Sequence, residues 1–419
     1  MRIAVLVALG AFAGAPASAL AQGLTLADAQ RRAVEAAPQL AAARASMRAA
    51  QEMARAAGRR PDPVLRLQVQ NLPVTGPDRF ELTTDFMTMQ SAGLTQEFTR
   101  GEKLERRTER YEREADKAGA ERDAARANVQ AASALAWIER FYAERIADQV
   151  AGEREEARRE VDAAQASYRG GRGTQSDLLA ARALIVGLED RLAQARSRIR
   201  VASEGLARWI GPAAYEPLAG NVNWRELPHH MAGEDIRLED HPEIQAASKE
   251  VGVAEAQLRV AQAERTPDWS WEVMYNHRGP AYSDMVTFGV SVPLPWDRGN
   301  KQDREIAARR ALVDQAEARR EQVVREHAAE VRGMIVEWKE GVARLDRYEH
   351  EWLPLLHERT QAALAAYAGA KGSLAEVLAA RRGELEVRVQ ELELESETAR
   401  AWAKLSFLVP VDLPARSTP

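Results

Sequence analysis

The chain of 419 residues contains no cysteine. Disulfide bonds, a thiol nucleophile and cysteine-ligated zinc are therefore excluded. A lipid anchor on an N-terminal cysteine is not expected either. What holds the fold together must come from packing, hydrogen bonds and ion pairs alone.

Long hydrophobic runs are also scarce. Residues 1–21 combine Arg2, a short apolar run and Ala-x-Ala steps, which is the layout of a secretory signal peptide cleaved after Ala21 or, as an alternative, after Ala19. No later stretch reaches the roughly 18 uncharged residues of a transmembrane helix. We expect the exported chain, residues 22–419, to be either soluble or bound to a membrane through β-strands.

Strong basic charge and catalytic motifs are missing as well. The chain has 58 Lys and Arg against 63 Asp and Glu, so we expect no nucleic-acid partner. The stretch from His357 to Gln361 lacks the second histidine of a zinc-protease helix, and neither a nucleophile elbow nor a phosphate-binding glycine loop is present. The sequence predicts no enzyme and no cofactor.

Proline is absent between Pro77 and Pro212 and between Pro295 and Pro354. In both stretches apolar residues recur at helical spacing, and Val324, Val331, Trp338 and Leu345 follow a heptad. The stretch of about 67 residues from Glu102 to Tyr168 predicts a helix roughly 100 Å long.

A repeated motif follows each proline-free stretch. Tyr168 to Arg182 and Tyr367 to Arg381 keep an aromatic residue, glycines, a basic residue, a hydroxyl, an acid and an apolar pair in register. Glycine tolerates the left-handed backbone at a helix end, and Thr174 or Ser373 can cap the next helix. We therefore predict two helix hairpins, with the candidate site residues Tyr168, Gly171, Arg172, Gly173 and Asp177 in the first and Tyr367, Lys371, Gly372 and Glu376 in the second.

Four short segments within about 63–98 and 268–296 alternate apolar and polar residues, as a tilted membrane strand does. Arg-x-Pro-Asp precedes both pairs of strands, at Arg59 and Arg265, and an aromatic residue followed by Arg-Gly closes both. Thr99 and Asp297 are predicted to cap the ensuing helices. The predicted interface anchors are Phe98, Arg100, Trp269, Trp271, Trp296 and Arg298; an ordinary soluble sheet core is the alternative.

The fold class is thus a mixed α+β membrane protein, internally duplicated, with repeat one at about 24–211, a connector at 212–237 and repeat two at about 238–409. Four strands cannot close a barrel in lipid, where an open sheet edge leaves backbone groups unsatisfied. We expect a homotrimer that completes a 12-stranded transmembrane β-barrel, with a long-helix α-barrel outside the membrane.

These features together resemble the TolC-like outer-membrane channel proteins of tripartite efflux and type I secretion. The resemblance implies an outer-membrane location in a Gram-negative bacterium, a large periplasmic part, and a periplasmic adaptor and an inner-membrane pump as partners. It places the glycine hairpins at a gate that contacts the adaptor. Asp177 and Glu376 match acidic positions near the constriction, and they can also serve as helix caps.

The stretch from Gln96 to Arg107 is similar to the heavy-metal branch of that family, which implies metal cations such as copper, silver, cobalt, zinc or cadmium as cargo. Met87 and Met89 are candidate Cu(I) ligands on one strand, although a third ligand is not evident. Drug efflux and type I protein secretion are the alternatives for the same channel. A soluble periplasmic coiled-coil scaffold is the alternative of another class.

Overall fold

The structure is a computed structural model that describes residues 23–171, 174–227, 238–369 and 371–412. The predicted signal peptide lies outside the described residues. The strands are β1 (Val64–Gln70), β2 (Met89–Phe98), β3 (Trp269–His277) and β4 (Met285–Ser291). The helices are α1 (Leu26–Ala36), α2 (Pro38–Ala57), α3 (Gly101–Arg169), α4 (Gln175–Ile210), α5 (Pro242–Glu264), α6 (Gln302–Arg347), α7 (Leu353–Ala368) and α8 (Leu374–Ser406), with 3-10 turns η1 (Gly211–Tyr215) and η3 (Leu238–Asp240) and a π-helix η4 (Tyr348–Trp352).

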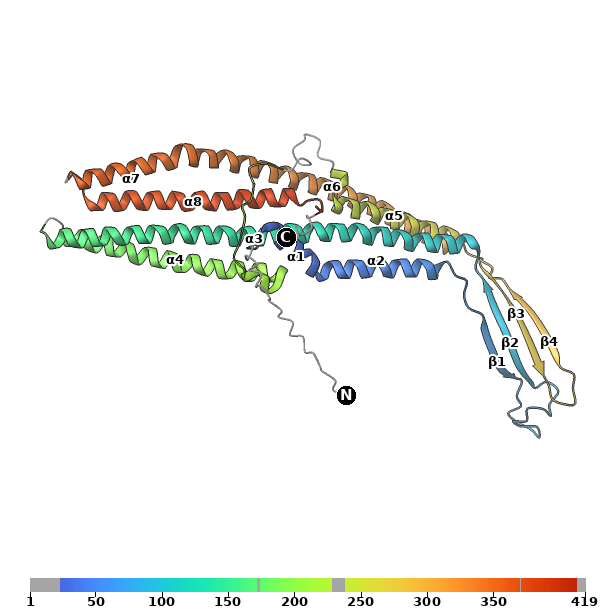
Figure 1. Ribbon diagram of the computed structural model, residues 1–419. Coiled ribbons are helices and arrows are strands. Elements are labelled where there is room, and N and C mark those ends of the chain that lie inside the picture. Colours follow the sequence, from blue (N-terminus) through green and yellow to red (C-terminus); the bar gives the residue numbers. More distant parts are fainter. Residues whose placement is uncertain (1–22, 172–173, 228–237, 370, 413–419) are drawn as a thin grey trace, which may run out of the picture.

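The molecule is elongated, with the strands at one end and the α3–α4 and α7–α8 connections at the other (Figure 1). The helix α3 has 69 residues and runs almost the whole way between them, which confirms the predicted length of about 100 Å. No described helix is long and apolar enough to span a membrane.

The main core lies midway along α3. Trp137, Ile138 and Tyr142 are almost fully buried there against α1, α4 and the end of α8. The indole N–H of Trp137 donates to the Leu24 carbonyl at 3.0 Å, which ties the beginning of the described chain to this core. The long helices therefore extend in both directions from one central hydrophobic core.

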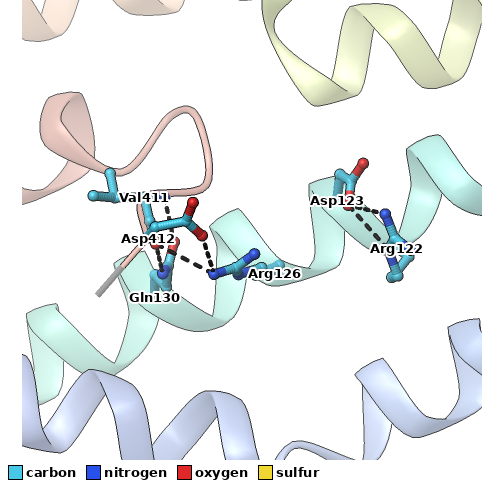
Figure 2. A network of polar contacts seen from close by, with 6 residues as sticks. All are labelled: Arg122, Asp123, Arg126, Gln130, Val411 and Asp412. Carbon is cyan, nitrogen blue, oxygen red and sulfur yellow. Dashed lines mark hydrogen bonds and ion pairs between the residues drawn. The ribbon is translucent and has the colours of Figure 1, made fainter. Parts of the chain in front are cut away.

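The C-terminal segment is fastened to the same region of α3 (Figure 2). The buried Gln130 amide donates to the Val411 carbonyl at 2.7 Å and accepts from the Val411 N–H at 3.0 Å. Arg126 adds an ion pair with Asp412 at 2.9 Å. A single glutamine thus replaces both backbone partners that a strand would have supplied to Val411.

Repeat two makes the equivalent long rod from α6, η4 and α7 rather than from one uninterrupted helix. Buried positions in α3 recur 198 residues later in α6: Ala118 with Ala316, Ser133 with Val331, Ala143 with Gly341 and Ala147 with Leu345. Beyond η4 the spacing becomes 199, since Tyr168 corresponds to Tyr367. A π turn closes i→i+5 hydrogen bonds, so η4 accommodates the one extra residue of repeat two.

The four strands form one antiparallel sheet in the order β1-β2-β3-β4. The pairing register aligns Leu65, Leu94, Val273 and Phe288 in one row across it. Phe288 of this row is 78% exposed, and Leu67, which lies on the same face in the next row, is 72% exposed. The row thus belongs to a face that is open to the surroundings.

The opposite face of the sheet holds polar groups. Ser91 and Asn276 are buried there and hydrogen-bonded to each other at 2.6 Å, and Asn276 also donates to Thr287 at 3.0 Å. A soluble sheet would bury its apolar face instead. The exposure of the apolar side argues against the soluble-core alternative and fits a sheet solvated by lipid.

The predicted caps after the strands are wrong. The N-cap of α3 is Arg100 and that of α6 is Lys301, and neither helix receives a side-chain cap. Thr99 is buried, whereas Asp297 accepts hydrogen bonds from the Asn300 side chain at 3.0 and 3.2 Å. The turn after β4 is therefore longer than the one after β2, and the two repeats enter their rods differently.

Candidate functional site

The first hairpin joins α3 to α4 at the end remote from the sheet (Figure 1). Gly171 has φ +71°, a left-handed conformation that side chains disfavour, so glycine is needed here. Thr174 then caps α4: its hydroxyl accepts the Asp177 N–H at 3.1 Å, while Asp177 accepts the Thr174 N–H at 3.2 Å. This reciprocal capping box fixes where the returning helix starts.

The second hairpin joins α7 to α8 with the same chemistry. The Lys371 N–H donates to the Ala366 carbonyl at 2.8 Å, and Ser373 and Glu376 form the capping box at 3.2 and 3.1 Å. A Cβ on Gly372 would lie 3.0 Å from the Ala366 Cβ, so close packing, and not a left-handed backbone, disfavours a side chain here. These two glycines occupy different positions of the repeated motif, since Gly171 corresponds to Ala370 and Gly372 corresponds to Gly173.

An apolar cluster holds the two hairpins together. It includes Leu178 and Leu184 from α4 with Leu374 and Val377 from α8, all buried, and Tyr367 packs against its edge. Because one cluster contains residues from both repeats, the hairpins of one chain form a single packed unit. Separating them would expose this apolar surface to water.

A charged network lies beside this cluster. Arg381 of α8 binds two carboxylates of α3, Glu156 through its Nη1 and Glu160 through its Nε. The side chain of Arg381 is only 18% exposed and that of Glu160 only 13%, whereas Glu156 is 44% exposed. The positive charge of Arg381, in repeat two, thus balances two carboxylates of repeat one at a partly buried position.

Two further carboxylates of this region titrate differently. Burial raises the pKa of Glu153 to about 7, and the negative charges of Glu156 and Glu160 add to the effect while Arg381 opposes it. Burial also opposes ionisation of Glu384, but hydrogen bonds from Arg388 and His357 outweigh it and lower its pKa. Glu153 therefore keeps its proton to a higher pH than an ordinary glutamate does.

The structure places the predicted hairpin residues in different environments. Arg172 and Gly173 lie outside the described residues. Asp177 and Glu376 are the acids of the two capping boxes, which confirms that half of the prediction. Tyr168 is exposed, Tyr367 packs on the apolar cluster, and Lys371 is exposed without an ion pair among the described residues. Their part in a gate stays a prediction.

The sequence also offered a signal for the network that the motif search missed. Glu153, Glu156 and Glu160 have spacings of three and four, which places them on one face of a helix. Arg381 is the last residue of the repeated motif, but its partners lie about 220 residues upstream. Only the packing of α8 on α3 shows that these groups meet.

The predicted interface anchors gather where the strands join the helices. Phe98 and Trp269 are opposite each other in the sheet and stack with their ring centroids 4.7 Å apart, and the Arg60 guanidinium lies 5.3 Å from the Phe98 centroid. Trp296 is highly exposed, Trp271 is half-buried, and Arg298 is exposed. The Arg100 N–H donates to Asp268 at 3.3 Å. Their contact with lipid stays a prediction.

Ligand-type side chains converge near η4 within the described residues, in the groups Asp346, Glu349 and His350, and Glu349, Glu391 and Glu395. Arg225 already pairs with Asp346 at 2.9 Å and with Glu349, and Arg145 pairs with Glu395 at 3.5 Å. Burial raises the pKa of both Glu391 and Glu395. Arginine and protons therefore balance these acids, and we assign no metal here.

The two-methionine site is not formed as predicted. Strand β2 begins at Met89, so Met87 lies in the preceding loop, where its N–H donates to Asp85 at 2.7 Å. The two thioethers do not share a strand face.

Comparison with solved structures shows which class of fold this is. Crystal structures of CusC, reported for transmembrane channel formation, align with TM-score 0.79 and 18% identity over 92% of each chain. The outer membrane protein VceC from Vibrio cholerae aligns with TM-score 0.74 and 19% identity over 93% of this chain and 97% of that one. The CmeC outer membrane channel of Campylobacter jejuni aligns with TM-score 0.77 and 14% identity over 92% and 85%. The fold is that of outer-membrane channel proteins.

The sequence itself narrows the class further. Residues 29–212 and 235–409 match the outer membrane efflux protein family, and the chain belongs to that family. A comparison with curated proteins gave no match. Membership confirms the predicted TolC-like fold and agrees with the prediction that the chain is a transport protein and not an enzyme.

Proposed function

We propose that this chain is one of three identical protomers of the exit duct of a tripartite efflux system. The observation that supports this best is the arrangement along the molecule. An apolar face of the sheet is exposed at one end, and two capped hairpins, packed into one unit, lie at the far end of rods about 100 Å long (Figure 1). The outer membrane would surround the sheet, and the rods would cross the periplasm.

In this proposal three sheets close a 12-stranded barrel, because β1 and β4 are otherwise open edges that lipid cannot satisfy. The polar face of each sheet, with Ser91 and Asn276, would line the water-filled path. The hairpins would contact a periplasmic adaptor that couples the duct to an inner-membrane pump. Opening would then require the contacts between neighbouring hairpins to loosen.

The proposed cargo is heavy-metal cations. Support comes from the stretch Gln96 to Arg107, which is similar to the heavy-metal branch. Drugs or a secreted polypeptide are the competing cargo for the same duct. A duct that passes ions should bind them weakly, so a tight metal site on the protomer is not needed.

Two experiments test the proposal. Cell fractionation should recover a heat-modifiable trimer in outer membranes, and the purified protein should conduct ions in planar bilayers; a soluble monomer would refute the channel. For the cargo, a deletion strain is compared with its parent for tolerance of copper, silver, zinc, cobalt and cadmium and for tolerance of drugs. Sensitivity to drugs alone would overturn the metal assignment.

A further inference from the structure

The internal duplication indicates which residues of one protomer meet the next one. Within the chain, repeat one contacts repeat two where α3 packs on α5 and where β2 pairs with β3. The elements equivalent to these in the other repeat are α6, α2, β4 and β1. β1 and β4 are the two outer strands of the sheet. If three copies form a ring, the edge of repeat two in one copy faces the edge of repeat one in the next.

Residue equivalence across the repeats is well defined near the sheet. Arg59 to Asp62 corresponds to Arg265 to Asp268, a spacing of 206 residues. In the long rods the spacing is 198, as the shared burial of Ala118 and Ala316 shows. Each residue of α3 and of the end of α5 therefore has a sequence counterpart in or next to α6 or the end of α2; Lys301, the counterpart of Lys103, lies immediately before α6.

Several ion pairs join the repeats at this level inside the chain, among them Arg107 of α3 with Glu264 of α5 at 3.2 Å. Two others have informative equivalents. Lys103 of α3 binds Asp268 at 2.9 Å, and the two side chains are only 6% and 14% exposed. Arg259 of α5 binds Glu109 of α3 at 3.1 Å. The first pair is sequestered, which is unusual for a lysine unless a partner compensates it.

The residues equivalent to Lys103 and Asp268 in the other repeat are also charged, but they do not pair with each other within the chain. Lys103 corresponds to Lys301, and Asp268 corresponds to Asp62. Both Lys301 and Asp62 are exposed, and the side chain of neither forms an ion pair among the described residues of the protomer. Both charges are thus present beside opposite edges of the sheet, at positions that one chain cannot bring together.

The second pair has an apolar equivalent. Glu109 corresponds to Ala307 and Arg259 to Met53, and Met53 is 48% exposed in the protomer. Neither position carries a charge, so no unpaired charge would remain at a contact between them. This makes sense if the positions face each other across an interface.

We propose, building on the proposed trimeric channel, that Lys301 of each protomer forms an ion pair with Asp62 of the next copy, beside a contact between Ala307 and Met53. This pair is the counterpart between protomers of Lys103 and Asp268. Asp62 comes just before β1, and Lys301 follows β4 and comes just before α6. The proposed ion pair therefore lies next to the two strand edges that must pair to close the barrel. It therefore fixes the register in which the edges meet.

Cysteine cross-linking can test this contact, because the chain contains no other thiol that could react. The full-length M53C/A307C variant, purified in detergent, is treated with a short bifunctional maleimide. We expect a covalent trimer on a denaturing gel. Neither single variant should give one, since two identical positions on neighbouring copies lie far apart.

Charge reversal tests the ion pair in the same background. D62K or K301D should lower the yield of covalent trimer by about tenfold or more, because like charges then meet at the contact. The D62K/K301D combination should restore it. K339D, at an exposed lysine of α6, is the matched control and should leave the yield unchanged.

The outcomes separate this inference from the proposed function. A trimer by light scattering that does not cross-link between positions 53 and 307, or reversals that the combination does not restore, would overturn the proposed pair and leave the channel standing. A protein that is monomeric both in detergent and in membranes would overturn the channel itself.

Discussion

Replacing Arg381 tests whether the charged network holds the two hairpins of one chain together. In R381Q the guanidinium that compensates Glu156 and Glu160 is gone, and Glu153 remains close by. Removing one partner of a buried ion pair costs about 3–5 kcal/mol. Because Glu156 is 44% exposed, water replaces part of the lost interaction, and we expect about 2–3 kcal/mol.

Hydrogen exchange measures this loss where it occurs. Local opening of the hairpins controls exchange of amides at the start of α8 and the end of α3. A loss of 2–3 kcal/mol should reduce their protection at pH 7 by about 30- to 150-fold, since 1.4 kcal/mol corresponds to a factor of about ten. Protection in α2 and α5, which are far from the network, should not change.

The neighbouring Arg382 provides the control. It is exposed and forms no ion pair among the described residues, so R382Q removes the same charge from the same helix without opening the network. Adding E160Q to R381Q should recover part of the protection, because the buried carboxylate no longer needs a cation. If R381Q and R382Q exchange alike, the network does not hold the hairpins, and the reasoning is refuted.

Three further changes test other parts of the structure. G171A should destabilise the first hairpin by about 1 kcal/mol because of its positive φ, whereas G187A in the middle of α4 should stabilise by about 0.5–1 kcal/mol, as thermal denaturation of the two variants would show. The raised pKa of Glu153 means that its protonation favours the packed hairpins: this contribution is complete below pH 4.5 and is lost as the pH rises through about 7. E153Q should therefore abolish the fall in hairpin protection between pH 5 and pH 8, and an unchanged fall would show that another group titrates. K103M should cost about 3–5 kcal/mol by leaving Asp268 sequestered without a cation, and D268N/K103M should recover most of it in a denaturation assay.

The order of helices, hairpins and strands could be predicted from the sequence, because each is marked by a periodic or local pattern of residues. The absence of proline predicted α3, and the glycine and hydroxyl positions predicted both hairpins with their capping boxes, since each depends on residues three or four apart. Alternation predicted the strands for the same reason. The exposed apolar side of the sheet also followed, because a period of two assigns every residue to a face.

The network of Arg381 was not accessible, because its members come from opposite repeats and meet only when α8 packs on α3. The wrong caps at Thr99 and Asp297 have a related cause. The flanking motifs are alike in the two repeats, but the chain after β4 makes a longer turn before its helix begins at Gln302. Sequence similarity between repeats gave the residue equivalence and not the local backbone.

The π-helix at Tyr348–Trp352 also has a consequence for how the two helical rods can diverge. One residue inserted in an unbroken α-helix would rotate everything beyond it by about 100° and shift it by about 1.5 Å. The second hairpin would then present a different side to its neighbours than the first does. By taking the insertion into one wide turn, repeat two keeps its hairpin in rotational phase with that of repeat one. A difference in length between the two helical rods is therefore accommodated where a helical turn can widen. What the fold preserves is the rotational orientation of each hairpin about its rod.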